Sequence, residues 1–293
     1  MRTTLPSAWR GRVDDEIRKP MRDAMMPGAT ARVPRDGDPD GAPRGLVALR
    51  GVSKSFSNGT TALSRLDLDV ADGEFLSLIG PSGCGKSTAL RILAGLAEPT
   101  TGTVIWTEGR PEVGFVFQEP TLMPWATVFD NVFLPLRLRK LPRRAAGPRI
   151  EDALARVGLS KFMNAYPREL SGGMKMRVSI ARALVLKPKL LLMDEPFAAL
   201  DEITRFRLND DLVALKAELG TTVVFVTHSV YESVYLSSRI VVMASRPGRI
   251  VETIAVPAPQ RRTEDFRSTP LYTETCRLAS QALHGAMAEE DHL

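Results

Sequence analysis

The chain has 293 residues, of which 44% are hydrophobic and 25% are charged, and its formal net charge is +5. This composition supplies a sizeable core and excludes a disordered or fibrous protein. The mild positive charge suits a membrane surface or a nucleotide and does not by itself indicate nucleic acid as a partner.

Cysteines and apolar runs limit where the protein works. Cys84 and Cys276 cannot form a useful disulfide framework, because Cys84 lies in a glycine-rich loop that a disulfide would distort. This pattern fits a reducing cytoplasm. No apolar run reaches the roughly 18 residues needed to span a bilayer, and the N-terminus lacks a hydrophobic segment for secretion. We therefore expect any membrane role to come through a partner.

The first 44 residues mix charged residues, prolines and glycines and show scarcely any apolar period. We expect residues 1–44 to form a mostly disordered arm, with a short helix near residues 14–26 and a solvated linker at residues 34–43.

Short alternating strands begin after this arm, at residues 46–50 and 66–70. A turn at residues 57–59 separates them, and Asp72-Gly73 forms the next turn. The pattern predicts an antiparallel layer beside a main sheet.

A glycine-rich loop follows, in which Gly80 to Ser87 matches G-x-x-x-x-G-K-S/T without a mismatch. The apolar run 74–79 before it predicts a buried strand, and residues 88–94 after it have helical spacing and end at Gly95. Strand, glycine loop and helix are the context of a phosphate-binding loop. The alternative is a glycine-rich turn with an incidental lysine.

The residue types of this loop suit a polyphosphate. Gly83 and Gly85 let the backbone turn inward, so that consecutive amides and a helix N-terminus converge on the anion. Lys86 adds a positive charge at the β and γ phosphates, and the Ser87 hydroxyl is placed to ligate Mg²⁺. The residues assigned to phosphate binding are Gly80, Pro81, Ser82, Gly83, Cys84, Gly85, Lys86, Ser87 and Thr88.

Strands and helices alternate through the rest of the chain. Residues 102–106 and 113–117 are strand-like, and buried strands are predicted at residues 190–193, 223–226 and 240–243. Residues 127–187 are helical in character, as is the stretch from Leu208 to Leu219, and Gly158 and Gly220 are suited to helix ends. A polar tail from residue 257 contains a short helix at 271–286.

One segment of the helical region is strongly basic. Residues 137–149 hold six basic residues and no acidic one. This segment is either a solvated helix surface or a contact with anionic lipid headgroups.

Two carboxylates, Asp194 and Glu195, follow directly on the strand 190–193. Ligands of parallel sheets bind beyond the strand ends, so an acidic pair at this place is the expected partner of a phosphate loop. Asp194 would hold Mg²⁺, and Glu195 would orient and polarise the attacking water. The alternative is a pair of charges at a helix N-terminus.

A second anion site is predicted at Leu170 to Met174, where Ser171 is suited to cap a helix and Gly172 and Gly173 expose its first amides. One nucleotide does not need two phosphate-binding helix ends. The two ends therefore belong to different nucleotide-contacting surfaces, which implies that two copies of the chain meet head to tail with ATP between them.

The motif order resembles the ATP-binding-cassette (ABC) ATPases over residues 46 to about 256. Leu170 to Gly173 is similar to the signature loop of that family. The remaining motifs follow in the family's order, namely the phosphate loop, Gln118, the signature, Asp194-Glu195, Ala199-Leu200-Asp201 and His228. The resemblance implies ATP and Mg²⁺ as ligands and an α/β P-loop NTPase core with a mainly parallel sheet, an antiparallel β subdomain and an inserted helical subdomain.

The resemblance also implies roles for single residues. Phe56 would stack on adenine, although it could be an ordinary core or edge aromatic. Gln118 would contact Mg²⁺ and sense the γ-phosphate, and Asp201 would couple the two sites of the dimer. His228 would contact the γ-phosphate, its alternative being a capping histidine. Met174 replaces the glutamine of many relatives, so a polar contact to the partner's nucleotide is in question.

The residues within and around these motifs resemble those of the nitrate/sulfonate/taurine importer subfamily, which includes pyrimidine-precursor uptake systems. The stretches that carry it are 117–125, 171–177 and 194–204. By this resemblance, residues 122–125 would lie in the groove that receives a permease's coupling helix, unless Trp125 packs in the core.

The sequence thus predicts an ATPase subunit of an importer, peripheral on the cytoplasmic face of the inner membrane. It would work as a homodimer with separate permease subunits and, indirectly, an extracytoplasmic solute-binding protein. The expected parts are the arm 1–44, an ATPase domain 45–256 and a tail 257–293. Within the domain, the core comprises 45–117 and 188–256 and the helical subdomain 118–187.

Two rival functions remain open from the sequence. A soluble non-transport cassette protein acting on ribosomes or DNA would favour paired cassettes, zinc cysteines or strongly basic arms, none of which appears, so no nucleic-acid partner is expected. A simple P-loop kinase would make the loop at Leu170 an ordinary helix N-cap.

Overall fold

The computed structural model describes residues 44–259 and 262–291, so the helix expected near residues 14–26 and the linker at 34–43 lie outside the described part. The strands are β1 Gly45–Ser55, β2 Thr61–Ala71, β3 Phe75–Ile79, β4 Thr101–Trp106, β5 Val113–Val116, β6 Leu190–Asp194, β7 Thr222–Val226, β8 Arg239–Ala244 and β9 Arg249–Ala255. The α-helices are α2 Lys86–Leu93, α3 Val128–Leu138, α4 Arg143–Arg156, α5 Gly172–Leu184, α6 Glu202–Leu219, α7 Val230–Leu236 and α8 Pro270–Asp291. Among these described helices, none has the length and apolar character needed to cross a membrane.

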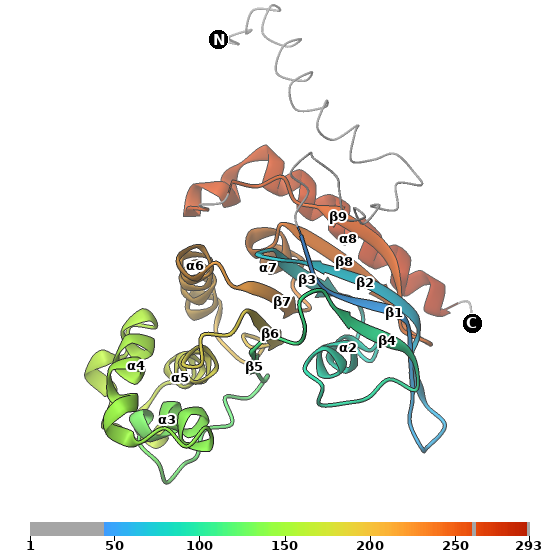
Figure 1. The fold of residues 1–293 in the computed structure, drawn as a ribbon. Helices are drawn as coiled ribbons and strands as arrows, with labels where there is room; N and C mark the ends of the chain where they lie inside the picture. The colour runs from blue at the N-terminus through green and yellow to red at the C-terminus, as the bar shows by residue number, and fades with distance from the viewer. Residues whose placement is uncertain (1–43, 260–261, 292–293) are drawn as a thin grey trace, which may run out of the picture. The chain divides into compact units, whose positions relative to one another are not determined.

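A six-stranded sheet with the order β5-β6-β7-β3-β8-β9 forms the centre of the fold (Figure 1). All neighbouring strands are parallel except β8 and β9, which pair antiparallel. Parallel strands end at the same edge of a sheet, so the segments that follow β3, β5, β6 and β7 lie side by side. The mainly parallel sheet predicted from the sequence is confirmed.

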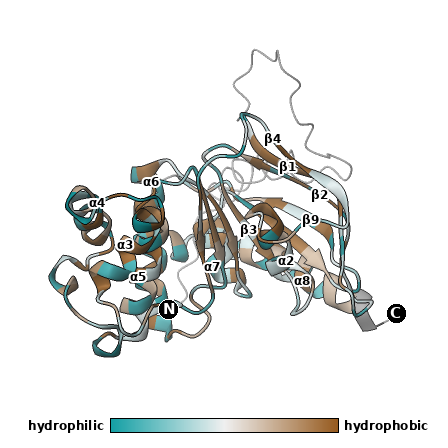
Figure 2. Cartoon of the chain, turned by 60° about the horizontal axis from the view of Figure 1, so that its bottom comes forward, coloured by the Kyte–Doolittle hydropathy of each residue, from teal (hydrophilic) through white to brown (hydrophobic). Residues whose placement is uncertain are grey.

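Both faces of the sheet are covered at its inner strands β3, β6 and β7, which explains why these strands are fully buried and mostly apolar. Successive residues of a strand point to opposite faces. Leu190 and Leu192 pack in one core with α2 and the antiparallel sheet, whereas Leu191 and Met193 pack in the other core with the later helices. Figure 2 shows the central strands coloured as hydrophobic along their length.

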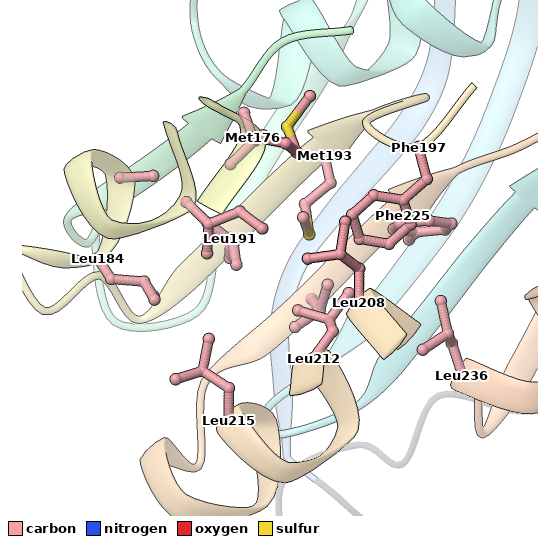
Figure 3. Close-up of a cluster of buried hydrophobic side chains, with 14 of the residues drawn as sticks. Met176, Leu184, Leu191, Met193, Phe197, Leu208, Leu212, Leu215, Phe225 and Leu236 are labelled. Carbon is pink, nitrogen blue, oxygen red and sulfur yellow. The ribbon is translucent and has the colours of Figure 1, made fainter. Parts of the chain in front are cut away.

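The second core is filled by aromatic and leucine side chains from β6, β7, α5 and α6. The rings of Phe197 and Phe225 lie 5.7 Å apart between their centroids. Figure 3 shows Leu208 and Leu212 of α6 in the same cluster as these rings. The segment that leaves β6 is therefore anchored by Phe197 just after its two carboxylates.

The antiparallel layer predicted from the sequence is present as a separate sheet with the order β2-β1-β4. Strands β1 and β2 are joined by the expected turn, in which Gly59 has a φ of 83°. Leu63 of β2 is fully buried against α2 and the main sheet, so this layer covers the phosphate-loop side of the sheet.

The helical region between β5 and β6 contains α3, α4 and α5, with short 3-10 turns at Ser160–Phe162 and Pro167–Glu169. The predicted apolar face of α4 is confirmed, because Ile150, Leu154 and Val157 are buried. Gly158 ends α4 with a φ of 70°, and Gly220 ends α6 with a φ of 62°, as the glycine positions predict.

The C-terminal part differs from the expected polar tail with a short helix. Strand β9 was not anticipated, and α8 extends over 22 residues. Phe266 and Tyr272 belong to the main core, and α8 runs along β8 and β9 (Figure 1). Tyr272, Cys276, Ala279 and Ala286 of α8 are buried among exposed polar residues, so the average composition of the segment conceals its burial.

This packing predicts that the C-terminal segment stabilises the whole domain. Replacing the buried Phe266 by alanine is expected to lower the free energy of unfolding by about 3 kcal/mol, because the cavity left beside Tyr235 and Tyr272 cannot close fully. Urea unfolding of the purified chain measures the change. Met287→Ala, at a half-exposed site of α8, is the control and should change the free energy by less than about 1 kcal/mol.

Candidate active site

The loop between β3 and α2 has a backbone that only glycine accommodates without strain. Gly83 and Gly85 have φ values of 80° and 91°. A Cβ at Gly85 would lie 2.5 Å from Leu63 Cδ2 and 2.7 Å from the Ala62 carbonyl oxygen. The loop is therefore pressed against the start of β2, with its amides and the N-terminus of α2 open to an anion.

Lys86 lies within the curve of this loop and is 4% exposed. Its Nζ donates to the Gly80 carbonyl at 2.8 Å and to the Pro81 carbonyl at 2.9 Å. The charge is thus fixed at the loop by the loop's own backbone. Burial raises the pKa of the neighbouring Cys84 thiol, against the charge of Lys86, so Cys84 remains a neutral buried thiol.

Oxygen ligands suited to a divalent cation meet beside the loop. The Ser87 hydroxyl donates to Asp194 Oδ1 at 2.7 Å, and Asp194, the last residue of β6, is 7% exposed. Hydroxyl and carboxylate oxygens are ligands that Mg²⁺ prefers. In the described part of the chain no three His, Cys, Asp or Glu residues gather to hold a metal by themselves. These two residues therefore fit an ion that takes its other ligands from phosphate oxygens and water.

Glu195 has an unusual backbone, with a φ of 48°. A left-handed conformation costs a non-glycine residue about 1 kcal/mol. It is held there because its N–H donates to the Val226 carbonyl at 3.0 Å, which ties the end of β6 to the end of β7. Its side chain is 15% exposed, and its Oε1 lies 2.6 Å from Nε2 of His228. Strain of this kind at a strand end is typical of functional sites.

Gln118 lies at the same sheet edge as Glu195, and Phe56 lies in an exposed turn. Val116 pairs with Met193 in the parallel ladder, so Gln118 leaves β5 at the same edge at which Glu195 leaves β6. Phe56 is 45% exposed in the turn between β1 and β2, with Lys54 Nζ 5.6 Å from its ring centroid. The alternative of a core position for Phe56 is therefore wrong.

The predicted second anion site is a capped helix start. Ser171 Oγ accepts a hydrogen bond from the Met174 N–H at 3.3 Å, which confirms it as the N-cap of α5. Gly173 is buried, and a Cβ there would lie 2.6 Å from Thr204 Cγ2. The starts of α5 and α6 are thus in contact. Met174 packs its apolar side chain against the core.

Asp201 is the N-cap of α6, whose first turn contacts the start of α5. It accepts a hydrogen bond from the Thr204 N–H at 2.9 Å. The side chain of Thr204, followed by this N–H, lowers the pKa of Asp201. Because the folded pKa is lowered, the stability that this cap contributes is present at neutral pH and is lost as the pH falls through that pKa. Asp201 is exposed, and its carboxylate stays charged at physiological pH.

The helices that begin at the two anion sites lie on opposite faces of the main sheet. Buried residues of α2 pack in one core and those of α5 in the other, and Figure 1 shows the two helices on either side of β5 and β6.

Comparison with known proteins shows the family to which the chain belongs. Residues 63–198 match the sequence profile of the family described as ABC transporter. The aliphatic sulfonates import ATP-binding protein SsuB 1 of Pseudomonas syringae is 47% identical over 82% of this chain and 96% of its own length. The chain belongs to the ABC transporter family.

Two further relatives show what proteins of this family do. The nitrate import ATP-binding protein NrtC of Synechocystis is 46% identical over 69% of this chain and 32% of its own length. The dimeric post-hydrolysis structure of the cassette MJ0796, bound to ADP and phosphate, is 35% identical with a TM-score of 0.63, covering 73% of this chain and all of that one. As an ABC transporter ATPase, this chain binds ATP and hydrolyses it to drive transport.

Three charged residues of this ABC ATPase escaped the sequence reasoning. Arg182 of α5 donates to the Pro120 and Thr121 carbonyls at 2.8 and 2.9 Å and so fixes the loop after Gln118. Arg205 and Glu232 lie in a cavity beside Glu195 and His228. Burial raises the pKa of Glu232, against its hydrogen bond from Thr227 and the charge of Arg205. A single arginine or glutamate within a helix gives no signal of its partners.

The phosphate loop allows a direct test of nucleotide binding. Lys86→Ala removes the fixed charge, and the affinity for ATP is expected to fall roughly tenfold to a hundredfold, the value of a charged hydrogen bond or two. Equilibrium binding of a fluorescent ATP analogue measures it. Lys161→Ala, at an exposed lysine of the helical region, should bind like the unaltered chain. Undiminished affinity of Lys86→Ala would exclude the loop as the phosphate site.

Proposed function

We propose that this chain is the ATP-hydrolysing subunit of an importer and works as a homodimer on the cytoplasmic face of the membrane. Each dimer would energise two permease subunits that receive solute from an extracytoplasmic binding protein. The observation that carries the proposal is the meeting of Lys86, the Ser87–Asp194 pair and the Glu195–His228 pair at one edge of the main sheet.

ATP would lie along the phosphate loop, with its phosphates on the amides of residues 80–88 and on Lys86. Phe56 would stack on the adenine, since its exposed ring stands at the turn that leads into β2, and β2 itself contacts Gly85. Ser87, Asp194 and Gln118 would hold Mg²⁺, Asp194 through water. When bound, this ion supplies neutralisation of the phosphate charge.

Glu195 would position and deprotonate the water that attacks the γ-phosphate, yielding ADP and phosphate. Its carboxylate is mostly buried and its direction is fixed by the strained backbone and by His228. A pre-positioned base needs no reorganisation at the moment of reaction. The His228 side chain, which is 42% exposed, lies against Glu195 and would also contact the γ-phosphate.

The second anion site, Ser171 to Gly173, would close on the ATP of a partner chain. This follows from the placement of α2 and α5 on opposite faces of the sheet, because one chain's own Ser171 cap begins a helix on the face away from α2. Asp201 lies beside this cap through the contact of Gly173 with Thr204. Asp201 would therefore transmit contact with the partner chain to helix α6 of its own chain.

Permease subunits would bind at the loop after Gln118. Trp125 is 76% exposed, so its alternative as a core residue is wrong. Thr121, a β-branched residue, has a φ of 46° and is held by Arg182 through its carbonyl and hydroxyl. A fixed loop that carries an exposed tryptophan suits a protein partner.

The solute class is inferred from the relatives, because this chain would contact the permease and not the solute. Their names specify aliphatic sulfonates and nitrate. We propose a small solute of the nitrate, sulfonate or taurine type, with pyrimidine precursors as the alternative.

In the basic segment 137–149, Arg139 pairs with Glu112, and Arg143 pairs with Asp130 and stacks on Phe129. These pairings favour a structural surface over a lipid contact.

Replacement of the proposed base tests the chemistry. Glu195→Gln is expected to lower the turnover of ATP by about a thousandfold, because the amide cannot accept the proton. ATP binding should persist, and the ATP-bound chain should elute as a dimer in size-exclusion chromatography. Glu151→Gln on α4 is the control. A turnover rate equal to that of the control would remove Glu195 from the role of base.

The permease contact is tested separately. Trp125→Ala is expected to leave basal ATP hydrolysis unchanged and to weaken co-purification with the permease from detergent-solubilised membranes, since the exposed ring is lost from the contact. The matched control is Phe162→Ala, which removes another exposed aromatic of the helical region. Equal recovery of permease with both variants would place the contact elsewhere.

A further inference from the structure

Glu195 and His228 line a cavity together with two oppositely charged side chains that have no role in the proposed chemistry. Arg205 comes from the first turn of α6, just after Asp201, and Glu232 comes from the first turn of α7, just after His228. The cavity therefore lies between the segment that leads into α6 and the segment that leads into α7.

Glu232 supports the backbone on both sides of His228. It is 6% exposed, and its Oε2 accepts a hydrogen bond from Thr227 Oγ1 at 2.5 Å. The same hydroxyl accepts from the Ser229 N–H at 3.0 Å. Through Thr227, the buried carboxylate fixes the residues directly before and after His228.

Arg205 supports the segment before α6. Its Nη2 donates to the Leu200 carbonyl at 3.1 Å, next to Asp201. Its Nε lies 3.7 Å from Glu232 Oε1, beyond hydrogen-bond distance. Neither Arg205 Nε nor Glu232 Oε1 has a hydrogen-bond partner, although both atoms are buried. The Asn209 side chain of α6 is a further polar neighbour of Glu232. Leaving buried polar atoms unpaired is unfavourable, so a shift of less than about 1 Å between α6 and α7 would gain a charged hydrogen bond.

We propose that Arg205 and Glu232 form a positioning pair that couples the Leu200–Asp201 segment to His228. A movement of that segment on contact with a partner chain closes the pair, and Glu232 transmits the closure through Thr227 to the imidazole that holds Glu195. The inference rests on the proposed function, since it acts through the Glu195–His228 pair. Neither residue of the positioning pair is assigned a contact with the nucleotide.

A double-mutant cycle on the full chain tests this coupling. Glu232→Gln keeps an acceptor for Thr227 and loses the charge, and Arg205→Met loses the guanidinium. Each is expected to lower kcat for ATP about tenfold and to leave KM within about twofold, because coupled side chains typically interact by about 1.4 kcal/mol. The double variant should be no slower than the slower single variant.

The matched control is the exposed ion pair Arg156–Glu218, which joins α4 to the other end of α6. Arg156→Met and Glu218→Gln should leave kcat unchanged. Thr227→Val, which removes the hydroxyl, should reproduce the kcat loss of Glu232→Gln, whereas Thr227→Ser should retain the activity. These variants also decide the matter if Glu232→Gln does not fold.

The outcomes separate this inference from the proposed function. Unchanged kcat in folded Glu232→Gln and Thr227→Val chains, or rate losses that multiply in the double variant, would overturn the positioning pair. If Glu195→Gln retains turnover, the proposed base fails instead, and the cycle then shows a coupling that does not pass through Glu195.

Discussion

The parallel pairing of β3, β7 and β6 is the constraint on which the site depends. It places the ends of three strands side by side, so that Lys86, Glu195 and His228 meet although they are far apart in the sequence. The pairing is fixed by burial on both faces, since a slip of one residue would exchange the side chains of the two cores. The packing of the two cores thus fixes the relative positions of Lys86, Glu195 and His228.

Several charged groups at this edge are held in unfavourable states. Glu195 has a left-handed backbone, Lys86 is buried in its loop, and Arg205 and Glu232 face each other with unpaired atoms. Such states persist when the surrounding structure determines them, and buried Phe197, packed on Phe225, anchors the segment directly after Glu195. Charged groups of this kind can form additional hydrogen bonds or ion pairs when ATP or a partner chain binds.

The sequence predicted the parts of the molecule that follow local rules. The glycine loop, the N-cap Ser171 and the helix end Gly220 each have a short-range cause, and the structure confirms them. The packing of Phe266 and the pairing of Arg205 with Glu232 were not predictable, because they join segments far apart in the chain and leave no periodic signal. The exposure of Trp125 likewise became decidable only once the core was known.

The central claim is that each catalytic pocket takes half of its residues from a partner chain. Mixing two inactive variants, Lys86→Ala and Gly172→Asp, measures this directly, because only a mixed dimer then contains one site in which both halves are intact. The account predicts that the separate variants are inactive and that their mixture recovers part of the ATP hydrolysis rate. A mixture as inactive as its components, with mixed dimers present, would contradict it.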